Sequence, residues 1–136
     1  MKIKVARSEL AKLRRRMKRA FPKERIEYLF GHVHGEVIHI HIFDHIPHVA
    51  TKSWCEVSEH DHVASVEACV DAGFMFLGTI HSHPGWRDAT PSETDQTNNI
   101  GELVQGIMAL WKDKSGRLCS RTKWWIPTLP METIQT

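Results

Sequence analysis

The sequence predicts an α/β protein in which a mixed β-sheet is flanked by helices. Three observations lead to this fold class. Apolar residues recur at helical spacing after capping residues, several segments alternate with the two-residue period of strands, and residues 74–80 form a continuous apolar run of strand length. The chain has 136 residues, of which 41% are hydrophobic and 25% charged, as in one globular domain. We therefore expect a single domain over residues 1–136.

The first two elements are predicted near the N-terminus. Ile3 and Val5 alternate with lysines, as in a short edge strand. A helix follows, with Ser8 as its predicted N-cap and Pro22 as its end. Apolar residues recur along this segment at helical spacing: Leu10, Leu13, Met17 and Phe21.

A β-hairpin is predicted next. Its first strand begins at Tyr28, the stretch from Gly31 to Gly35 forms the break, and its second strand spans residues 37–43. Alternation in the second strand places three isoleucines on one face and two histidines on the other: Ile38, Ile40 and Ile42 against His39 and His41.

A second helix begins at Ser58, with Asp61 in the capping-box position, and ends at Gly73. Its predicted apolar face consists of Val63, Val66 and Val70. The apolar run 74–80 follows and is predicted to be a central strand, buried on both faces.

Three elements complete the prediction. A third helix is expected from Thr90 to about Gly101 or Glu102, because Thr90, Pro91 and Glu93 fit its first turn. Strands are expected over residues 103–111 and 117–126. Trp124 and Trp125 are neighbours on the last strand and must face opposite sides.

The stretch after the central strand has the spacing of a metal site. His81 and His83 are two residues apart, so an extended backbone points both imidazoles to the same side. Asp95 falls in the first turn of the predicted third helix and is a candidate third ligand. Two histidines and one aspartate, with a fourth position for water, form the open set typical of catalytic zinc.

Two further groups are needed for metal-assisted hydrolysis. Ser92 lies three residues before Asp95, so its hydroxyl can approach a developing oxyanion beside the metal. A carboxylate must accept the proton of the attacking water, and it must come from outside this stretch.

These residues resemble the signature of the JAMM zinc metalloproteases, also called the MPN+ or JAB/Mov34-domain family. The likeness consists of His81-x-His83-Pro84, then Ser92-x-x-Asp95, and upstream Pro22-x-Glu24 with Gly31 seven residues after the glutamate. The resemblance implies a cytidine-deaminase-like JAB/MPN domain, as in compact prokaryotic or phage-type members.

The resemblance also implies roles for individual residues. His81, His83 and Asp95 would bind one Zn²⁺. Glu24 would be the general base and Ser92 the oxyanion stabiliser. The family hydrolyses isopeptide or peptide bonds, chiefly those that join ubiquitin-like proteins to lysines. The implied partner is a ubiquitin-like protein or a peptide with an extended C-terminal tail, which an exposed sheet edge can bind by strand addition.

Some assignments stay open at this point. Glu27 is a rival to Glu24 as the base, and Asp88 is a rival to Asp95 as a ligand, because the loop before Ser92 carries one residue more than the family pattern. The eight other histidines are expected to be surface residues: His32, His34, His39, His41, His45, His48, His60 and His62.

Charge and composition bear on partners and location. Residues 1–25 hold eleven Lys and Arg against two Glu, although the whole chain has a net charge of +2. This basic helix is expected to be a solvated face rather than a nucleic-acid site, because no aromatic residues are interleaved for base stacking. A non-catalytic binding module that uses this helix is the alternative function, and cell-wall or phage-tail peptides are alternative substrates. No apolar run approaches the roughly 20 residues of a membrane helix, and we expect a cytoplasmic protein.

Overall fold

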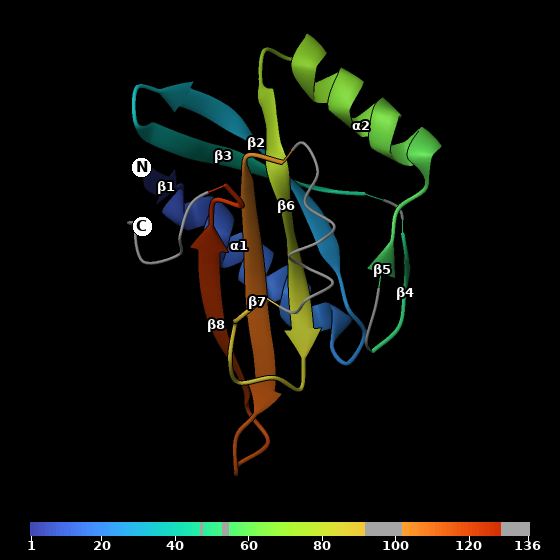
Figure 1. Ribbon diagram of the computed structural model, residues 1–136. Coiled ribbons are helices and arrows are strands. Elements are labelled where there is room, and N and C mark those ends of the chain that lie inside the picture. Colours follow the sequence, from blue (N-terminus) through green and yellow to red (C-terminus); the bar gives the residue numbers. More distant parts are fainter. Residues whose placement is uncertain (47, 53–54, 92–101, 129–136) are drawn as a thin grey trace.

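The computed structural model describes residues 1–46, 48–52, 55–91 and 102–128 and shows a mixed β-sheet with a helix on each face (Figure 1). In this part of the chain, the main sheet has the order β1-β3-β2-β6-β7-β8. Its strands are β1 (Lys2–Val5), β2 (Ile26–His34), β3 (Val37–His45), β6 (Met75–Pro84), β7 (Val104–Lys112) and β8 (Leu118–Trp125). The pairs β1–β3 and β6–β7 are parallel and the others antiparallel, so the predicted mixed sheet is confirmed.

Two short strands and two helices complete the described elements: β4 (Val49–Ala50), β5 (Cys55–Glu56), α1 (Arg7–Ala20) and α2 (Glu59–Asp71). The strands β4 and β5 pair only with each other and were not predicted. The predicted third helix falls largely on residues 92–101, which lie outside the described residues. No helix in the described part of the chain combines the length and apolar character needed to cross a membrane.

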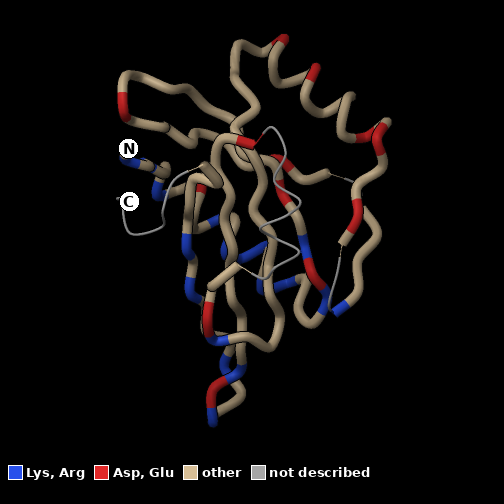
Figure 2. The backbone as a smooth tube through the Cα atoms, viewed as in Figure 1, with Lys and Arg blue, Asp and Glu red and all other residues tan. Residues whose placement is uncertain are grey.

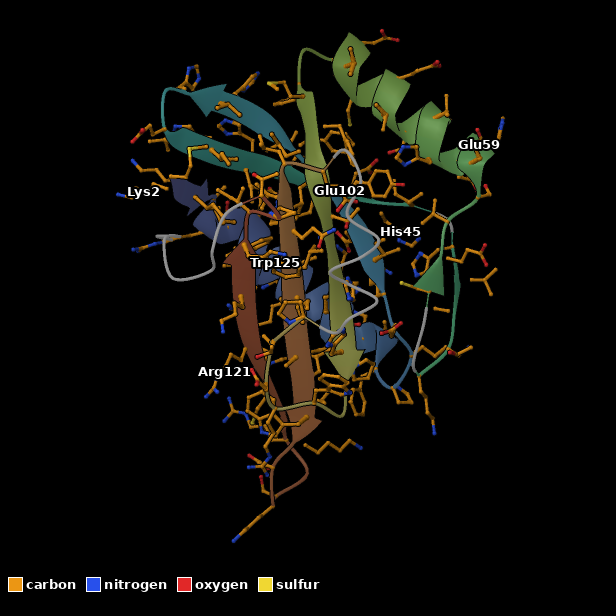
Figure 3. The ribbon with its side chains drawn as sticks, in the orientation of Figure 1. Lys2, His45, Glu59, Glu102, Arg121 and Trp125 are labelled. Atoms are coloured by element: carbon orange, nitrogen blue, oxygen red, sulfur yellow. The ribbon has the colours of Figure 1, made fainter. Side chains whose placement is uncertain are left out.

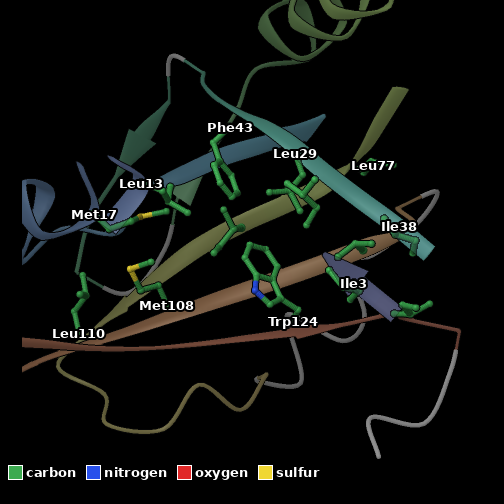
Figure 4. Packing of buried hydrophobic residues seen from close by; sticks show 14 residues of the cluster. Ile3, Leu13, Met17, Leu29, Ile38, Phe43, Leu77, Met108, Leu110 and Trp124 are labelled. Atoms are coloured by element: carbon green, nitrogen blue, oxygen red, sulfur yellow. The ribbon is translucent and has the colours of Figure 1, made fainter. Parts of the chain in front are cut away.

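Helix α1 covers one face of the sheet and seals the main core (Figure 4). Leu13 and Met17, one turn apart, are fully buried against Leu29, Met108 and Trp124. Lysines and arginines are frequent along the rest of this helix (Figure 2). The helix begins at Arg7, so the prediction of Ser8 as N-cap is wrong: the Ala6 N–H donates to Ile40 O at 3.2 Å and carries the pairing with β3 up to the helix start.

Helix α2 covers the opposite face near one end of the sheet. Its predicted cap is confirmed, because the Ser58 hydroxyl accepts a hydrogen bond from the Asp61 N–H at 3.1 Å. Its predicted apolar face is correct only for Val66, which packs on the cluster of Tyr28, Phe30 and Ile46. Val63 and Val70 are 44% and 54% exposed, so this helix contacts the sheet along a narrower stripe than its valines indicate.

The hairpin of β2 and β3 is longer than predicted. Strand β2 continues through Gly31 to His34, and the turn lies at Gly35, whose φ is 59°. The predicted break is therefore wrong for residues 31–34. Gly31 serves close strand approach instead, because a Cβ there would lie 1.8 Å from the carbonyl oxygen of His39.

A β-bulge changes which side chains face α1. The register shifts between Phe30 and Gly31, which pair with Ile42 and Ile40, so His41 is the extra residue. Ile38 and Ile40 pack in the α1 core, whereas Ile42 packs with the cluster under α2. The prediction that Ile42 shares their face is wrong, because one extra residue reverses the alternation.

The buried tyrosine offers a test of the packing between α2 and the sheet. Tyr28 is 3% exposed, and its hydroxyl forms a hydrogen bond with Nδ1 of His62 on α2. Burial, and secondarily the Glu102 carboxylate, raises the pKa of Tyr28 to about 12. This pKa exceeds the unfolded value of about 10. The contribution of the protonated Tyr28 to the free energy of unfolding is therefore fully present below pH ~10 and is lost as the pH rises towards 12.

We predict that the phenol of this protein titrates near pH 12 in the native state and near pH 10 in urea. The chain has one tyrosine, so tyrosinate absorbance in the near ultraviolet reports Tyr28 alone. A native midpoint equal to the denatured one would contradict the burial of this side chain.

Candidate metal centre

Two imidazole nitrogens meet near the C-terminal end of β6. The strand stays extended through Pro84, so His81 and His83 face the same side of the sheet, as predicted. Their Nε2 atoms are hydrogen-bonded at 3.0 Å and their ring centroids are 4.9 Å apart. Two nitrogens bound to a tetrahedral zinc at ~2.0–2.1 Å would lie about 3.3 Å apart. The pair is thus already near the separation of two zinc ligands.

The residues next to the histidine pair on the neighbouring strand are apolar. His81 and His83 pair in register with Ile107 and Ala109 on β7. These two residues pack with Ala89 and Trp125 in a separate buried cluster. Trp124 packs in the α1 core instead, so the prediction that the two tryptophans face opposite sides is confirmed. An apolar surface of this kind strengthens electrostatic interactions with any charge held above it.

The loop after β6 turns back over this surface. Gly85 has a φ of 86°, and its N–H donates to Leu110 O at 2.6 Å. The Trp86 ring lies 4.6 Å from the His83 ring and is 47% exposed. Trp86 therefore covers one side of His83, which is itself 5% exposed.

The segment before β2 is fixed to β6 by two hydrogen bonds. The Arg25 N–H donates to Ser82 Oγ, and the Ser82 N–H donates to Arg25 O, both at 2.9 Å. Ile26 pairs with His81, and Arg25 is bonded to Ser82. The next residue back on one side is Glu24 and the next residue on the other is His83, so the backbone of Glu24 lies level with that of His83. Residues directly opposite in a sheet share a face, and we infer by alternation that Glu24 is on the histidine face. Glu24 is 8% exposed, and its N–H donates to Thr51 O at 2.7 Å.

The rival base Glu27 lies on the other face of the sheet, beneath α1. Arg16 binds both of its carboxylate oxygens, with Nε and Nη2 each at 2.8 Å, and Arg25 Nε adds a third contact at 2.8 Å. Glu27 is fully buried and pairs in register with Ile80, a residue of the α1 core. A carboxylate held by two guanidinium groups on the opposite face is a structural anchor.

The remaining predicted residues divide between described and undescribed parts of the chain. Asp88 Oδ1 accepts hydrogen bonds from the Thr90 N–H at 3.1 Å and the Thr90 hydroxyl at 2.8 Å, so this side chain caps a turn. Ser92 and Asp95 lie outside the described residues. Among the residues that are described, no three His, Cys, Asp or Glu side chains converge on one point. Of the three predicted ligands, His81 and His83 lie in the described part of the chain.

One acidic residue near this site was not predicted. The carboxylate of Glu102 accepts hydrogen bonds from Thr79 Oγ1 at 3.2 and 3.3 Å and from Gln105 Nε2 at 2.5 Å. Thr79 precedes His81 by two residues, so Glu102 lies on the histidine face beside β6 (Figure 3). Burial raises the pKa of Glu102. No motif in the sequence distinguishes this glutamate, because its contact with Thr79 joins segments that are 23 residues apart.

Comparison with known proteins gives a consistent result. A family model described as prokaryotic homologs of the JAB domain matches residues 6–126. A solved structure from Desulfitobacterium hafniense superposes with a TM-score of 0.66 at 16% identity, covering 88% of this chain and 82% of that one. A JAB1/MPN domain protein from Archaeoglobus fulgidus superposes with a TM-score of 0.58 at 21% identity, covering 93% and 89%. A comparison with curated proteins finds no match.

The anchoring role of Glu27 predicts a large effect on stability. We expect Glu27→Gln to lower the free energy of unfolding by about 3 kcal/mol, because both guanidinium groups lose their buried counter-charge. The matched control is Glu9→Gln, which breaks the exposed Lys12–Glu9 pair and should cost at most ~0.5 kcal/mol. Urea denaturation measures both values, and equal losses would contradict the anchor.

Proposed function

This chain belongs to the prokaryotic homologs of the JAB domain, and we propose that it is a JAMM-type zinc peptidase that hydrolyses an isopeptide or peptide bond. The observation that carries the proposal is the 3.0 Å approach of the His81 and His83 Nε2 atoms on the strand where the sequence signature places them. The chemistry of this donor set supports zinc, which binds imidazole nitrogen and carboxylate oxygen in open tetrahedral sites. Asp95 would complete the set. Zinc held there would polarise the scissile carbonyl and supply a water with a pKa near ~7.

The proposed base is Glu24. Its carboxylate would accept the proton of the attacking water and deliver it to the leaving amine. The hydrogen bonds of its own N–H to Thr51 and of Arg25 to Ser82 fix its backbone, so little ordering is needed when substrate binds. Glu27 is not proposed as the base, because its carboxylate already accepts three hydrogen bonds from Arg16 and Arg25.

The remaining proposed roles concern the oxyanion and the substrate. Ser92 Oγ would donate a hydrogen bond to the developing oxyanion. The substrate would be a ubiquitin-like protein or another small protein with an extended C-terminal tail, which fits a sheet edge by strand addition. Assays of isopeptide conjugates, unconjugated precursors and cell-wall or phage-tail peptides separate the possible substrates.

A second candidate is a binding module without turnover. A cavity of about 630 Å³ lies between β1, α1 and β8, and its lining includes Lys4, Arg7 and Arg14. Such a cavity favours an acidic partner. Addition of a chelator distinguishes the two functions, because it should abolish cleavage but leave binding at this cavity unchanged.

We predict that Glu24→Gln retains zinc and loses about 10²–10⁴-fold in kcat, the usual contribution of a general base. The matched control is Glu36→Gln in the exposed hairpin turn, which should keep full turnover. Metal analysis and cleavage kinetics on the same preparations measure both quantities. Full turnover by Glu24→Gln would refute the role of this residue.

We further predict that Asp95→Ala loses zinc and activity together, whereas Asp88→Ala keeps both. Asp88 is already committed to capping the turn at Thr90, so its removal should affect only the local loop. Zinc content and turnover check this pair of variants. The reverse pattern would assign the third ligand position to Asp88.

A further inference from the structure

The sequence contains the His-x-His spacing four times, at residues 32–34, 39–41, 60–62 and 81–83. The first two copies lie on the neighbouring strands β2 and β3. Val33 and Ile40 turn towards the α1 core, so the histidines beside them face the other side of the sheet. We define the histidine tetrad as His32, His34, His39 and His41.

Each imidazole of the tetrad has two other imidazoles of the tetrad as neighbours. Ring centroids are separated by 5.3 Å for His32–His41, 5.6 Å for His34–His39, 5.9 Å for His39–His41 and 6.1 Å for His32–His34. Two imidazoles on one tetrahedral zinc have centroids about 5 Å apart, given Zn–N bonds of ~2.0–2.1 Å. The four distances between neighbouring rings exceed this separation by at most about 1 Å.

The β-bulge produces this gathering. His41 is the extra residue of the bulge, and its Cδ2 lies 3.2 Å from where a Cβ of Gly31 would be. The absence of a side chain at Gly31 therefore leaves room for the His41 ring beside that of His32. His32 and His39 are half-buried, whereas His34 and His41 are exposed and accessible to an ion from solvent.

The surroundings of the tetrad suit a cation. His32 Nε2 donates a hydrogen bond to the carbonyl of Gly73 at 3.0 Å, which leaves its Nδ1 with the lone pair that a metal requires. Metal-binding histidines usually donate their other N–H to a carbonyl in this way. Gly73 follows the C-terminal end of α2, where the helix dipole is negative and no basic residue occupies the last turn.

We propose that the histidine tetrad is a second metal site, which binds a divalent transition ion of the zinc class through imidazole nitrogens. With the imidazole rings in their present orientations, no three donor atoms converge on one point in the described part of the chain. Binding therefore requires the rings to rotate. Rotation is inexpensive for histidine, because its terminal torsion is broad and two of the rings are exposed. The site is independent of His81 and His83, which lie on another strand.

Calorimetric titration of the full chain with ZnCl₂ tests this proposal. The wild-type protein is expected to bind about two zinc ions, and the double variant His39→Ala/His41→Ala should lose one of them. The matched control is His60→Ala, an exposed histidine on α2 outside the tetrad, which should keep both.

A second variant separates this site from the proposed peptidase centre. His81→Ala/His83→Ala should retain the tetrad ion, and circular dichroism shows whether its fold is native. If the peptidase centre alone fails to bind, the wild type binds one ion and His39→Ala/His41→Ala abolishes it. Unchanged stoichiometry in the tetrad variant would overturn the proposal, including the case in which His45 and His48, with centroids 5.4 Å apart, hold the ion instead.

Discussion

The two-residue period of the paired strands β2 and β6 is the constraint on which the candidate centre depends. Ile26 lies opposite His81 and Arg25 is bonded to Ser82, so each neighbouring residue is assigned to a face. Glu24 and Glu27 are three positions apart, an odd number, and cannot share a face of an extended chain. Glu27 therefore belongs to the α1 side, and alternation assigns Glu24 to the side of the histidines.

The α1 side uses its glutamate to organise the basic N-terminal helix. Arg16 contacts Glu27 from the helix, and Arg25 contacts it from the position just before β2. Arg16 projects from the helix turn that also carries the core residues Leu13 and Met17. The ion cluster therefore fixes the position of α1 along the strand at the same level as the histidines on the other face. Part of the strong N-terminal charge is thus structural, which a count of lysines and arginines does not reveal.

Most strands were predictable because their pattern is local, and the histidine pair was predictable because its direction follows from one extended segment. The wrong predictions share a different cause. Ile42 changes face because His41 forms a bulge with a partner strand, and Ser8 loses its capping role because Ala6 bonds across to Ile40. Which of Glu24 and Glu27 lies on the histidine face likewise follows from the register with β6. Glu102 could not be predicted, since Thr79, which contacts it, lies on another strand.

The His-x-His segments on β2, β3 and β6 show why spacing alone does not define a site. On β6 the pair lies opposite Ile107 and Ala109 of β7, which belong to a buried apolar cluster. On the hairpin, the histidine pair of β2 lies beside the histidine pair of β3. The neighbours of each imidazole there are other imidazoles, at a largely exposed surface. The same spacing along a strand therefore stands beside buried apolar residues on β6 and beside further histidines on the hairpin. The neighbours that the sheet places opposite, rather than the spacing along the strand, distinguish these two surroundings.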